Sequence, residues 1–452
     1  MKIIVCGAGS VGKSIVSYLV KGNNDIVVID SDQHKLDDIS KEFDVRPLLG
    51  SASHPEILEK ANARKAELLI AATNVDEVNM VACEVAHSLF NVPRKIARID
   101  AQDFLEPIWA TLYNEKSIPI DQIISPDVEI AKSIHQMLKI PGVSEALPLF
   151  DGHLHLLAFR LPKNCQLIKT PLLHLERIVP GLNINIVNVS RDGRNFIPYK
   201  NDMLDEGDEV YMLLKTEDID NVITAFGLEH PAIERVVIFG GNQISRSLGR
   251  LLEKDDNILS CKIIEENLAA AQSLAKDLNE TVVLHGEQMS DLILIEAGLA
   301  NADAAVSVTM RDEDNLISSL LAQKSGVRNS ISLINSPAYN RLIEIIGNSI
   351  LVDRTTVTIS SILKELRKSR INEAYALGRG FGEIWEMPIM EDNVNINKPI
   401  CSVGLPACSK ICAVMRDNDI FYPGDKDELK LNDKIILYIE SGAVKKVEKF
   451  FP

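Results

Sequence analysis

A glycine-rich hexapeptide near the start of the chain has the residue types and the spacing of a phosphate-binding turn. It comprises Gly7, Ala8, Gly9, Ser10, Val11 and Gly12. The first glycine permits a tight turn, the second lets the backbone approach a pyrophosphate, and the third lets a helix pack on a strand. The free amides and the dipole of a helix N-terminus attract phosphates. We therefore predict that residues 7–12 hold the pyrophosphate of a dinucleotide.

An acidic residue follows this turn at the distance expected of a ribose-binding carboxylate. Asp30 ends the apolar run IVVID, eighteen residues after Gly12. A carboxylate there accepts hydrogen bonds from ribose hydroxyls and repels a 2′-phosphate, so the pattern favours NAD over NADP. A plain strand-end turn is the alternative, because Ser31 and Asp32 follow. Asp32 is either a second ribose contact or a helix cap.

Three more polar residues lie at the ends of runs that are predicted to be strands of the same sheet. Thr73 and Asn74 end the run that begins ELLIAA, and Arg98 lies at the end of KIARI. The carboxyl ends of parallel strands line the ligand crevice, so all three are candidate nucleotide contacts. Thr73 and Asn74 also fit a cap for the helix expected from Asp76, and both roles can hold at once. Arg98 is interpreted as a phosphate ligand, with a surface salt bridge as the alternative.

An alternation of strands and helices must position these residues. Short β-branched runs alternate with stretches whose apolar residues recur at helical spacing, which predicts parallel β-α-β units in a doubly wound, Rossmann-like sheet. Helix patterns over 127–140 and 355–371 lead into two strand-rich segments, 145–226 and 380–452. We expect these segments to be small α+β modules. The helices before them are connectors and our candidates for a dimer crossover and hinge.

The whole chain is a tandem repeat of about 225–236 residues. Gly7 corresponds to Gly240, and TNVDEVN corresponds to TMRDEDN 236 residues later. The predicted fold class is therefore α/β, with two Rossmann-like doubly wound parallel-sheet domains, each followed by a small α+β module. The expected boundaries of the two Rossmann-like domains and of the two connector helices with their modules are 1–125, 126–227, 228–350 and 351–452.

The nucleotide motif of the second copy is degraded. Its candidate residues are Gly240, Gly241, Asn242, Gln243, Ile244 and Glu265. Asn242 replaces the second glycine and Ser245 the third, and an asparagine side chain crowds a pyrophosphate. Glu265 keeps the acidic position, but no arginine matches Arg98. We predict weaker or altered nucleotide binding in this copy.

Composition and charge argue against several classes of function. The net charge of −16 and the lack of a basic patch argue against a nucleic-acid partner. Seven scattered cysteines without a C-x-x-C pair favour a reducing compartment over a disulfide framework or a zinc site. No stretch approaches the ~18 apolar residues that a membrane helix needs, and MKIIVCGAG is interpreted as a strand rather than a signal peptide.

No catalytic or metal-binding group is expected. Tyr211 and Lys215 have the spacing of the tyrosine–lysine pair of short-chain dehydrogenases, but that pair needs a helix and these residues lie on a predicted strand. His153 and His155 would share one strand face as metal ligands, although ordinary surface histidines are the favoured interpretation. We therefore expect that the chain is not an enzyme.

Several motifs together resemble the regulators of Trk-type potassium uptake. They are GAGSVG, IVVID, TNVDEVN, ARID, EGDEVYMLL and their weaker second copies. This family belongs to the class of proteins that regulate the conductance of potassium, with KTN (RCK N-terminal) and TrkA-C domains. The resemblance implies a cytoplasmic protein, peripheral on the inner face of the plasma membrane, that gates a membrane subunit of the TrkH/TrkG type. It also implies a homo-oligomer, namely a tetramer with a ring of nucleotide domains.

The same resemblance implies the ligand. Family members bind NAD(H), and some bind ATP or ADP at the same site. The matching positions are Gly7 to Val11, Asp30, Thr73, Asn74 and Arg98 in the first copy, and Gly240 to Ile244 and Glu265 in the second. The departures are Ser51, where an acidic residue is usual, Asn242 and Ser245. The predicted function is a nucleotide-binding regulatory subunit, and an NAD-dependent oxidoreductase is the alternative.

Overall fold

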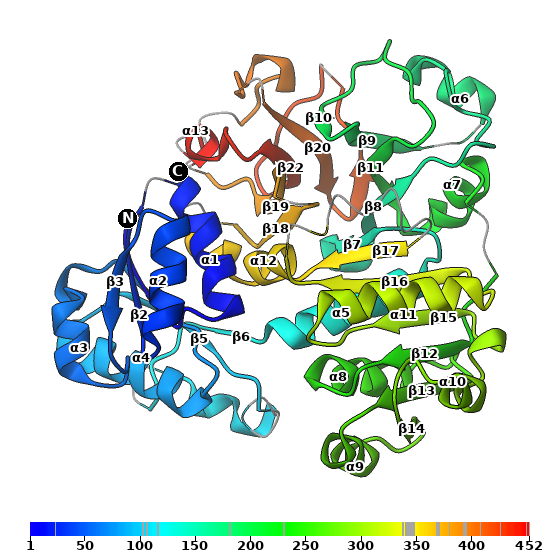
Figure 1. Cartoon of the computed structure of the whole chain (residues 1–452). Helices are drawn as coiled ribbons and strands as arrows, with labels where there is room; N and C mark the ends of the chain where they lie inside the picture. Colours follow the sequence, from blue (N-terminus) through cyan, green and yellow to red (C-terminus); the bar gives the residue numbers. More distant parts are fainter. Residues whose placement is uncertain are drawn as a thin grey trace. The chain divides into compact units, whose positions relative to one another are not determined.

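The computed structural model describes most of the chain, which forms two compact units (Figure 1). The residues that it does not describe are 23, 102–103, 105–106, 115–116, 180, 182, 229–230, 337–338, 340–348, 368–370, 379, 392–395, 407, 425, 449 and 452. The first unit comprises residues 1–129 and 355–366, and the second comprises 130–354 and 367–452.

The first unit is built on a six-stranded parallel sheet in the order β3-β2-β1-β4-β5-β6. Its strands are β1 (Lys2–Cys6), β2 (Asp25–Asp30), β3 (Arg46–Leu49), β4 (Leu68–Ala71), β5 (Arg94–Arg98) and β6 (Gln122–Ile124). Four helices connect them, α1 (Ser10–Lys21), α2 (Gln33–Glu42), α3 (Pro55–Lys60) and α4 (Asp76–Phe90). The strand order reverses between β1 and β4, which places a ligand crevice at the carboxyl ends of these strands.

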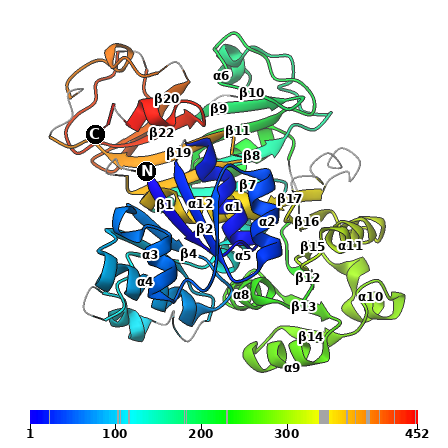
Figure 2. The ribbon, with the colours of Figure 1, turned by 60° about the vertical axis from the view of Figure 1, so that its left-hand side comes forward.

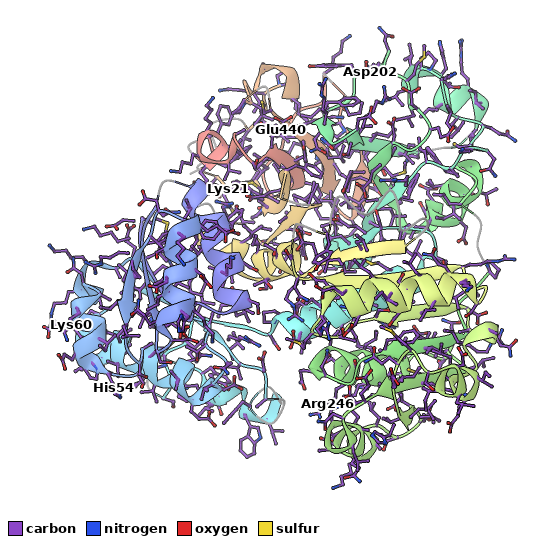
Figure 3. The ribbon with its side chains drawn as sticks, in the orientation of Figure 1. Lys21, His54, Lys60, Asp202, Arg246 and Glu440 are labelled. Carbon is purple, nitrogen blue, oxygen red and sulfur yellow. The ribbon has the colours of Figure 1, made fainter. Side chains whose placement is uncertain are left out.

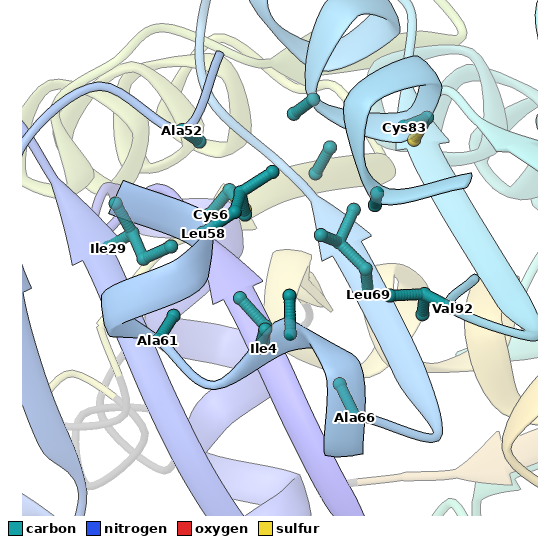
Figure 4. Packing of buried hydrophobic residues seen from close by; sticks show 14 of the residues in the cluster. Ile4, Cys6, Ile29, Ala52, Leu58, Ala61, Ala66, Leu69, Cys83 and Val92 are labelled. Atoms are coloured by element: carbon teal, nitrogen blue, oxygen red, sulfur yellow. The ribbon is translucent and has the colours of Figure 1, made fainter. Parts of the chain in front are cut away.

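An apolar core packs α3 and α4 against one face of this sheet (Figure 4). Ile4, Ile29 and Leu69 project from three strands into one buried cluster with Leu58 of α3 and Cys83 of α4. The strands are buried on both faces, as a parallel sheet covered by helices on both sides requires. The burial of apolar surface, at roughly 25 cal/mol per Å², holds the strand ends rigidly in place.

Two helices belong, in whole or in part, to a different unit from the one that their position in the sequence would suggest. Helix α5 (Pro126–Lys139) begins in the first unit, and its residues from 130 onwards belong to the second. Helix α12 (Arg354–Leu366) follows the second parallel sheet in sequence, yet residues 355–366 belong to the first unit. These are the two connectors that the sequence suggested for a crossover.

Hydrogen bonds hold each exchanged helix within the unit that it joins. In the first unit the Gln122 side chain of β6 donates to the carbonyl of Ser361 in α12 at 2.7 Å. In the second unit the His135 imidazole of α5 lies 2.9 Å from the carboxylate of Asp255, and both side chains are largely buried. Both connectors are therefore part of the packed structure rather than exposed linkers.

The second unit contains a parallel sheet with the same topology, in the order β14-β13-β12-β15-β16-β17. Its strands are β12 (Arg235–Phe239), β13 (Ser260–Glu265), β14 (Val282–His285), β15 (Ala304–Ser307), β16 (Asn329–Ile334) and β17 (Ser349–Asp353). Its helices are α8 (Gln243–Leu252), α9 (Leu268–Asp277), α10 (Asp291–Ala297) and α11 (Asp312–Lys324). The two sheets confirm the predicted pair of Rossmann-like folds.

Two five-stranded antiparallel sheets complete the second unit, in the orders β10-β9-β11-β8-β7 and β18-β19-β22-β20-β21. The first sheet, with its helices, contains β7 (Glu145–Leu149), β8 (Leu154–Arg160), α6 (Leu175–Ile178), β9 (Ile184–Arg191), β10 (Arg194–Phe196), β11 (Glu209–Lys215) and α7 (Ile219–Ala225). The second contains β18 (Glu373–Leu377), β19 (Gly382–Pro388), β20 (Ser409–Arg416), β21 (Asp419–Phe421), β22 (Lys434–Glu440) and α13 (Val444–Glu448). These are the two small α+β modules that the sequence predicts.

The two modules share one apolar core and exchange hydrogen bonds. Phe150, Tyr211, Ile384 and other side chains from both modules form a single buried cluster. The Gly378 amide donates to the Glu145 carboxylate at 2.8 Å, and the Phe150 amide donates to the Glu386 carboxylate at 2.9 Å. Burial, together with a smaller contribution from the nearby Glu209, raises the pKa of Glu145 to about 8.

A forked ion pair recurs at the same place in both modules. Arg191 donates through Nε and Nη2 to Asp208 at 2.8 and 2.7 Å. Arg416 donates in the same way to Asp433, at 2.8 Å from each nitrogen. The aspartate side chain is 1% exposed in each pair, so loss of one partner would leave a buried charge without compensation.

Candidate functional site

The first Gly-rich turn requires glycine at two positions for steric reasons. Gly7 has a φ of +108°, and a Cβ there would lie 2.6 Å from the carbonyl oxygen of Ala72 in the loop after β4. A Cβ at Gly12 would collide with the carbonyl oxygen of Gly7 itself. The turn between β1 and α1 therefore depends on both glycines to pack against its own strand and its neighbour.

The second glycine of the motif, Gly9, leaves open space at the start of α1. Gly9 is the N-cap residue, with a φ of −72°, and has no side chain to cap the helix. A Cβ built on Gly9 would meet nothing within 4 Å. Backbone amides at a helix start carry partial positive charge, so this open position can accept an anionic group. The geometry fits the pyrophosphate of a dinucleotide.

Asp30 lies directly against this turn. Its carboxylate accepts hydrogen bonds from the amide of Ala8 at 2.6 Å and from the amide of Asp32 at 2.9 Å. A carboxylate has about four lone-pair sites, so acceptor capacity is left for ribose hydroxyls. Asp32 is the cap of α2 and accepts from the amides of His34 and Lys35. Of the two roles considered for Asp32, the structure shows the helix cap.

A buried asparagine holds the ends of β4 and β5 together. Asn79 accepts from the amide and the hydroxyl of Thr73, and its Nδ2 donates to the carbonyls of Thr73 and Arg98. Thr73 also receives the amide of Val75 on its hydroxyl, as expected of a residue that shapes a helix start. Asn74, which lies between Thr73 and Val75, is exposed. Thr73 and Arg98 are thus fixed at the sheet edge where Gly7 lies.

Arg98 forms the salt bridge that the sequence left as the alternative, and one of its donors is left without a partner among the described residues. Its Nη2 forms an ion pair with Asp100 at 2.5 Å. Its Nε is buried and has no hydrogen-bond partner in the part of the chain that the structure describes. Burial raises the pKa of Asp100, against the opposing effect of Arg98. An arginine with one unsatisfied donor at a ligand crevice fits an anionic ligand such as phosphate.

The second Gly-rich turn has the same path but is closed by its own side chains. Gly240 has a φ of +98°, and the Gly241 amide donates to Glu265 at 2.5 Å, as Ala8 does to Asp30. The Asn242 side chain occupies the position left open at Gly9. Its Oδ1 accepts from the amides of Ile244 and Ser245 at 2.9 and 3.3 Å, and its Nδ2 donates to the carbonyl of Val308.

The hydrogen bonds at the strand ends of the second copy match those of the first copy. Asn315 accepts from the amide and hydroxyl of Thr309 and donates to the carbonyl of Leu333, the counterpart of Arg98. Ser245 replaces Gly12, and its hydroxyl donates to the carbonyl of Gly240. The last candidate, Gln243, is the first residue of α8. The second site therefore lacks both the open helix start and the arginine.

The groups considered for catalysis or metal binding lie elsewhere. Tyr211 is buried in the shared core of the modules with its ring edge-on to Phe381. His155 is buried on β8 and bonded to the Thr216 hydroxyl, whereas His153 precedes the strand and is exposed. The two histidines therefore do not share a strand face. Among the residues that the structure describes, no cluster of three or more histidine, cysteine or acidic side chains could hold a metal ion.

Comparison with known proteins decides the family. The model of the TrkA-N domain matches residues 3–126 and 236–354, and that of the TrkA-C domain matches 156–227. The Trk system potassium uptake protein TrkA of Azorhizobium caulinodans is 32% identical over 451 residues, which cover 100% of this chain and 98% of that protein. The chain belongs to the TrkA family of potassium uptake proteins. As a member of this family the chain is not an enzyme.

Solved structures share the fold of this TrkA-family chain. The RCK domain of GsuK covers 100% of this chain and 94% of its own, with a TM-score of 0.62 and 17% identity. The GsuK channel bound to NAD covers 99% and 79%, with a TM-score of 0.61 and 16% identity. GsuK bound to ADP covers 81% and 69%, with a TM-score of 0.51 and 13% identity. At these identities the likeness establishes the fold.

Sequence reasoning missed two residues that build the site. Asn79 and Asp76 were seen only as members of a repeated motif. In the structure Asn79 joins the two strand ends, and Asp76 accepts from the amides of Asp100 and Ala101 at 3.0 and 2.9 Å. The recurrence of T-x₅-N in both halves was the available signal, because a polar residue kept at the same place in two diverged copies indicates a shared structural role.

Proposed function

We propose that this TrkA-family chain binds NAD(H) on the first Gly-rich turn and uses the bound nucleotide to regulate a membrane potassium transporter. The observation that carries the proposal is the uncapped start of α1 at Gly9, beside the carboxylate of Asp30. Phosphates would rest on the amides of residues 7–12, and a ribose would bind Asp30. Arg98 would contact phosphate, and Thr73 and Asn74 would line the crevice.

ATP and ADP are proposed to compete for the same site. Both carry an adenosine ribose for Asp30 and phosphates for the helix start, so they use the same kinds of contact as NAD(H). The solved GsuK complexes with NAD and with ADP support this ligand class. At the second turn, Gly240 to Ile244 with Glu265, we propose weaker binding, because Asn242 already occupies the amides that a phosphate would need.

The proposed partner is a membrane subunit of the TrkH/TrkG type. We propose that the chain assembles as a homotetramer and lies on the cytoplasmic face of the plasma membrane through that subunit. The curated TrkA relatives, named as Trk system potassium uptake proteins, support a transporter partner. None of the helices that the structure describes is both long and apolar enough to cross a bilayer.

Regulation would work as a shift between two conformations of the assembly. A ligand shifts such an equilibrium only by its difference in affinity for the two states. A tenfold difference is about 1.4 kcal/mol at each site, so four sites in one assembly would change the ratio by about four orders of magnitude. No chemistry on the nucleotide is needed.

Calorimetric titration of the full chain with NADH, NADPH and ATP tests the site. We expect saturable NADH binding, competition by ATP, and NADPH binding at least tenfold weaker because its 2′-phosphate meets Asp30. Potassium flux into vesicles that contain the membrane subunit should then change with NADH when the chain is present. Absence of NADH binding, or binding that leaves the flux unaltered, would contradict the proposal.

A further inference from the structure

Helix α10 of the second copy presents apolar side chains to solvent on its outer face. Leu292 is 79% exposed and Ile295 is 76% exposed. The inner face of the same helix is also apolar, because Ile293 and Leu294 pack on the core of the second parallel sheet. The four central residues of α10, 292–295, are therefore all apolar, and such a helical stretch is normally buried. The ribbon of α10 lies next to the second parallel sheet, in contact with β13 (Figure 2), and the exposed fractions of Leu292 and Ile295 show that its outward side is uncovered.

The first copy supplies an internal control for this surface. Gly50 packs on Ile57 just as Gly286 packs on Ile293, so the two helices α3 and α10 align residue by residue. Glu56 and Glu59 therefore occupy the positions of Leu292 and Ile295. Figure 3 shows Lys60 at the surface end of α3, where it pairs with Glu56 at 2.6 Å. The same fold thus accepts charge at these positions, and the second copy carries leucine and isoleucine instead.

Further apolar side chains extend the exposed surface. Val282 on the edge strand β14 is 49% exposed and Met289, just before α10, is 38% exposed. Arg46 and Ser53 occupy these positions in the first copy. We define the α10 face as Val282, Met289, Leu292 and Ile295. Exposed apolar residues gathered on one surface, with polar counterparts in a homologous copy, indicate an interaction site.

The charge around the α10 face restricts what can cover it. From Glu287 to Glu296 the chain has three acidic residues and no lysine or arginine, and Lys262 of β13 donates to the carbonyl of Glu296. Glu287, Asp291 and Glu296 border the apolar positions and are exposed. Two copies of this surface would repel each other, and anionic lipid would be repelled in the same way. The complementary partner is a protein surface with apolar anchors and a rim of lysine and arginine.

We propose that the α10 face docks onto cytoplasmic loops of the membrane potassium-transporter subunit, a proposal that rests on the function proposed above. Cytoplasmic loops of membrane proteins are enriched in lysine and arginine, which matches the acidic rim. Leucine and isoleucine at the centre would fill apolar recesses of the loops and exclude water from the surrounding charge pairs. The first copy, with Glu56 and Glu59, serves as the nucleotide sensor, and the second serves as the contact with the transporter.

The test compares Leu292→Glu/Ile295→Glu with Tyr199→Glu in the full chain. Tyr199 belongs to the same unit, is 78% exposed, and lies in a module away from α10, so it is the matched control. Each protein is assayed for capture of the detergent-solubilised TrkH/TrkG-type subunit, for NADH affinity and for assembly mass. We expect the double variant to lose at least tenfold in capture with NADH affinity and mass unchanged, and capture by the parent to weaken with added salt.

Each other result has a distinct meaning. If the double variant captures the subunit as well as the parent does, the α10 face is not the contact. If its assembly mass falls, a second copy of this chain covers the face, and if phosphatidylglycerol vesicles bind the parent but not the variant, lipid covers it. Both results overturn the docking proposal. If the parent itself fails to capture the subunit, the proposed function fails rather than the assignment of this surface.

Discussion

The two Gly-rich turns of this chain share a backbone path and differ in what occupies the start of the following helix. In the first copy Gly9 leaves the start of α1 open. In the second copy the Asn242 side chain caps α8 and also donates to the carbonyl of Val308. A fold can therefore keep a dinucleotide-binding topology while one side chain replaces the ligand at the helix N-terminus.

The difference separates positions that build the fold from positions that face a ligand. The threonine–asparagine clamp is the same in both copies, at Thr73 with Asn79 and at Thr309 with Asn315. The third glycine of the motif is not kept in the second copy. Ser245 takes its place, and the Ser245 hydroxyl donates to the carbonyl of Gly240. Replacement of a motif glycine in the second copy thus leaves the sheet and the helix intact. What changes is the space at the helix N-terminus, where a ligand would bind.

The largest effect is expected from Gly9→Asn, which transfers the capping side chain to the first copy. The φ of −72° suits asparagine and no atom lies within 4 Å of its Cβ, so the fold should be retained. We expect NADH affinity to fall about a hundredfold, or ~2.7 kcal/mol, measured by calorimetry. Gly9→Ala is the control and should lose less. Unchanged affinity in the asparagine variant would show that phosphates do not rest on this turn.

The reciprocal change, Asn242→Gly, should open the second turn. Loss of the cap costs the helix only a few tenths of a kcal/mol when glycine replaces asparagine. We expect a second class of NADH sites to appear, about tenfold to thirtyfold weaker than the first because Leu333 stands in place of Arg98. Stoichiometry measured at saturating NADH would rise relative to the parent. If it does not, the missing arginine rather than Asn242 closes the second site.

A smaller effect is expected from Asp30→Asn. The amide oxygen can still accept from Ala8, but the charge that binds ribose hydroxyls and repels a 2′-phosphate is lost. We expect NADH affinity to fall about tenfold, ~1.4 kcal/mol, and the discrimination against NADPH to narrow. Glu265→Gln at the matching position should change neither value. Equal effects of both substitutions would mean that the two turns contribute alike.

The smallest effect concerns stability and compares Glu145 with its exposed counterpart Glu373. Burial raises the pKa of Glu145 to about 8, so the folded state holds a proton that the unfolded state releases. The contribution of Glu145 to the free energy of unfolding is fully present below about pH 4.5 and is lost as pH rises towards 8. The free energy of unfolding therefore falls over this range by at most about 1.4 kcal/mol per pH unit. Chemical unfolding of Glu145→Gln should lack this slope, and Glu373→Gln should retain it. A parent whose stability is flat from pH 5 to 8 would contradict the assignment.

Local patterns were sufficient to predict the fold class and the sheet edge that carries the site. Runs such as IVVID are β-branched and lie between helical patterns, which requires parallel strands with helices on both faces. The repeat then assigned the same topology to the second half. The domain boundaries stay predictions. The ligand contacts also stay predictions, although the structure shows where the candidate contact residues lie.

Contacts between residues far apart in sequence could not be predicted in the same way. The pairing of Gln122 with Ser361 joins positions 239 residues apart, and no local periodicity reports it. The role of Asn242 depends on its rotamer and on the carbonyl of Val308, so the sequence showed only that its side chain would crowd a phosphate. Arg98 likewise pairs with Asp100, and its Nε has no partner among the residues described, a combination that composition cannot predict.

The exchange of α5 and α12 makes the two halves of the chain depend on each other for a complete core. Each half contributes a helix that completes its sister, as in a domain-swapped dimer whose subunits have been joined by a peptide bond. A fragment that ends after the first module would lack the buried Ile362 and Leu363 of α12 and would expose an apolar seam. We therefore expect that neither half forms its complete core without the other, so that the second nucleotide-binding fold is needed for structure even where its own turn is closed.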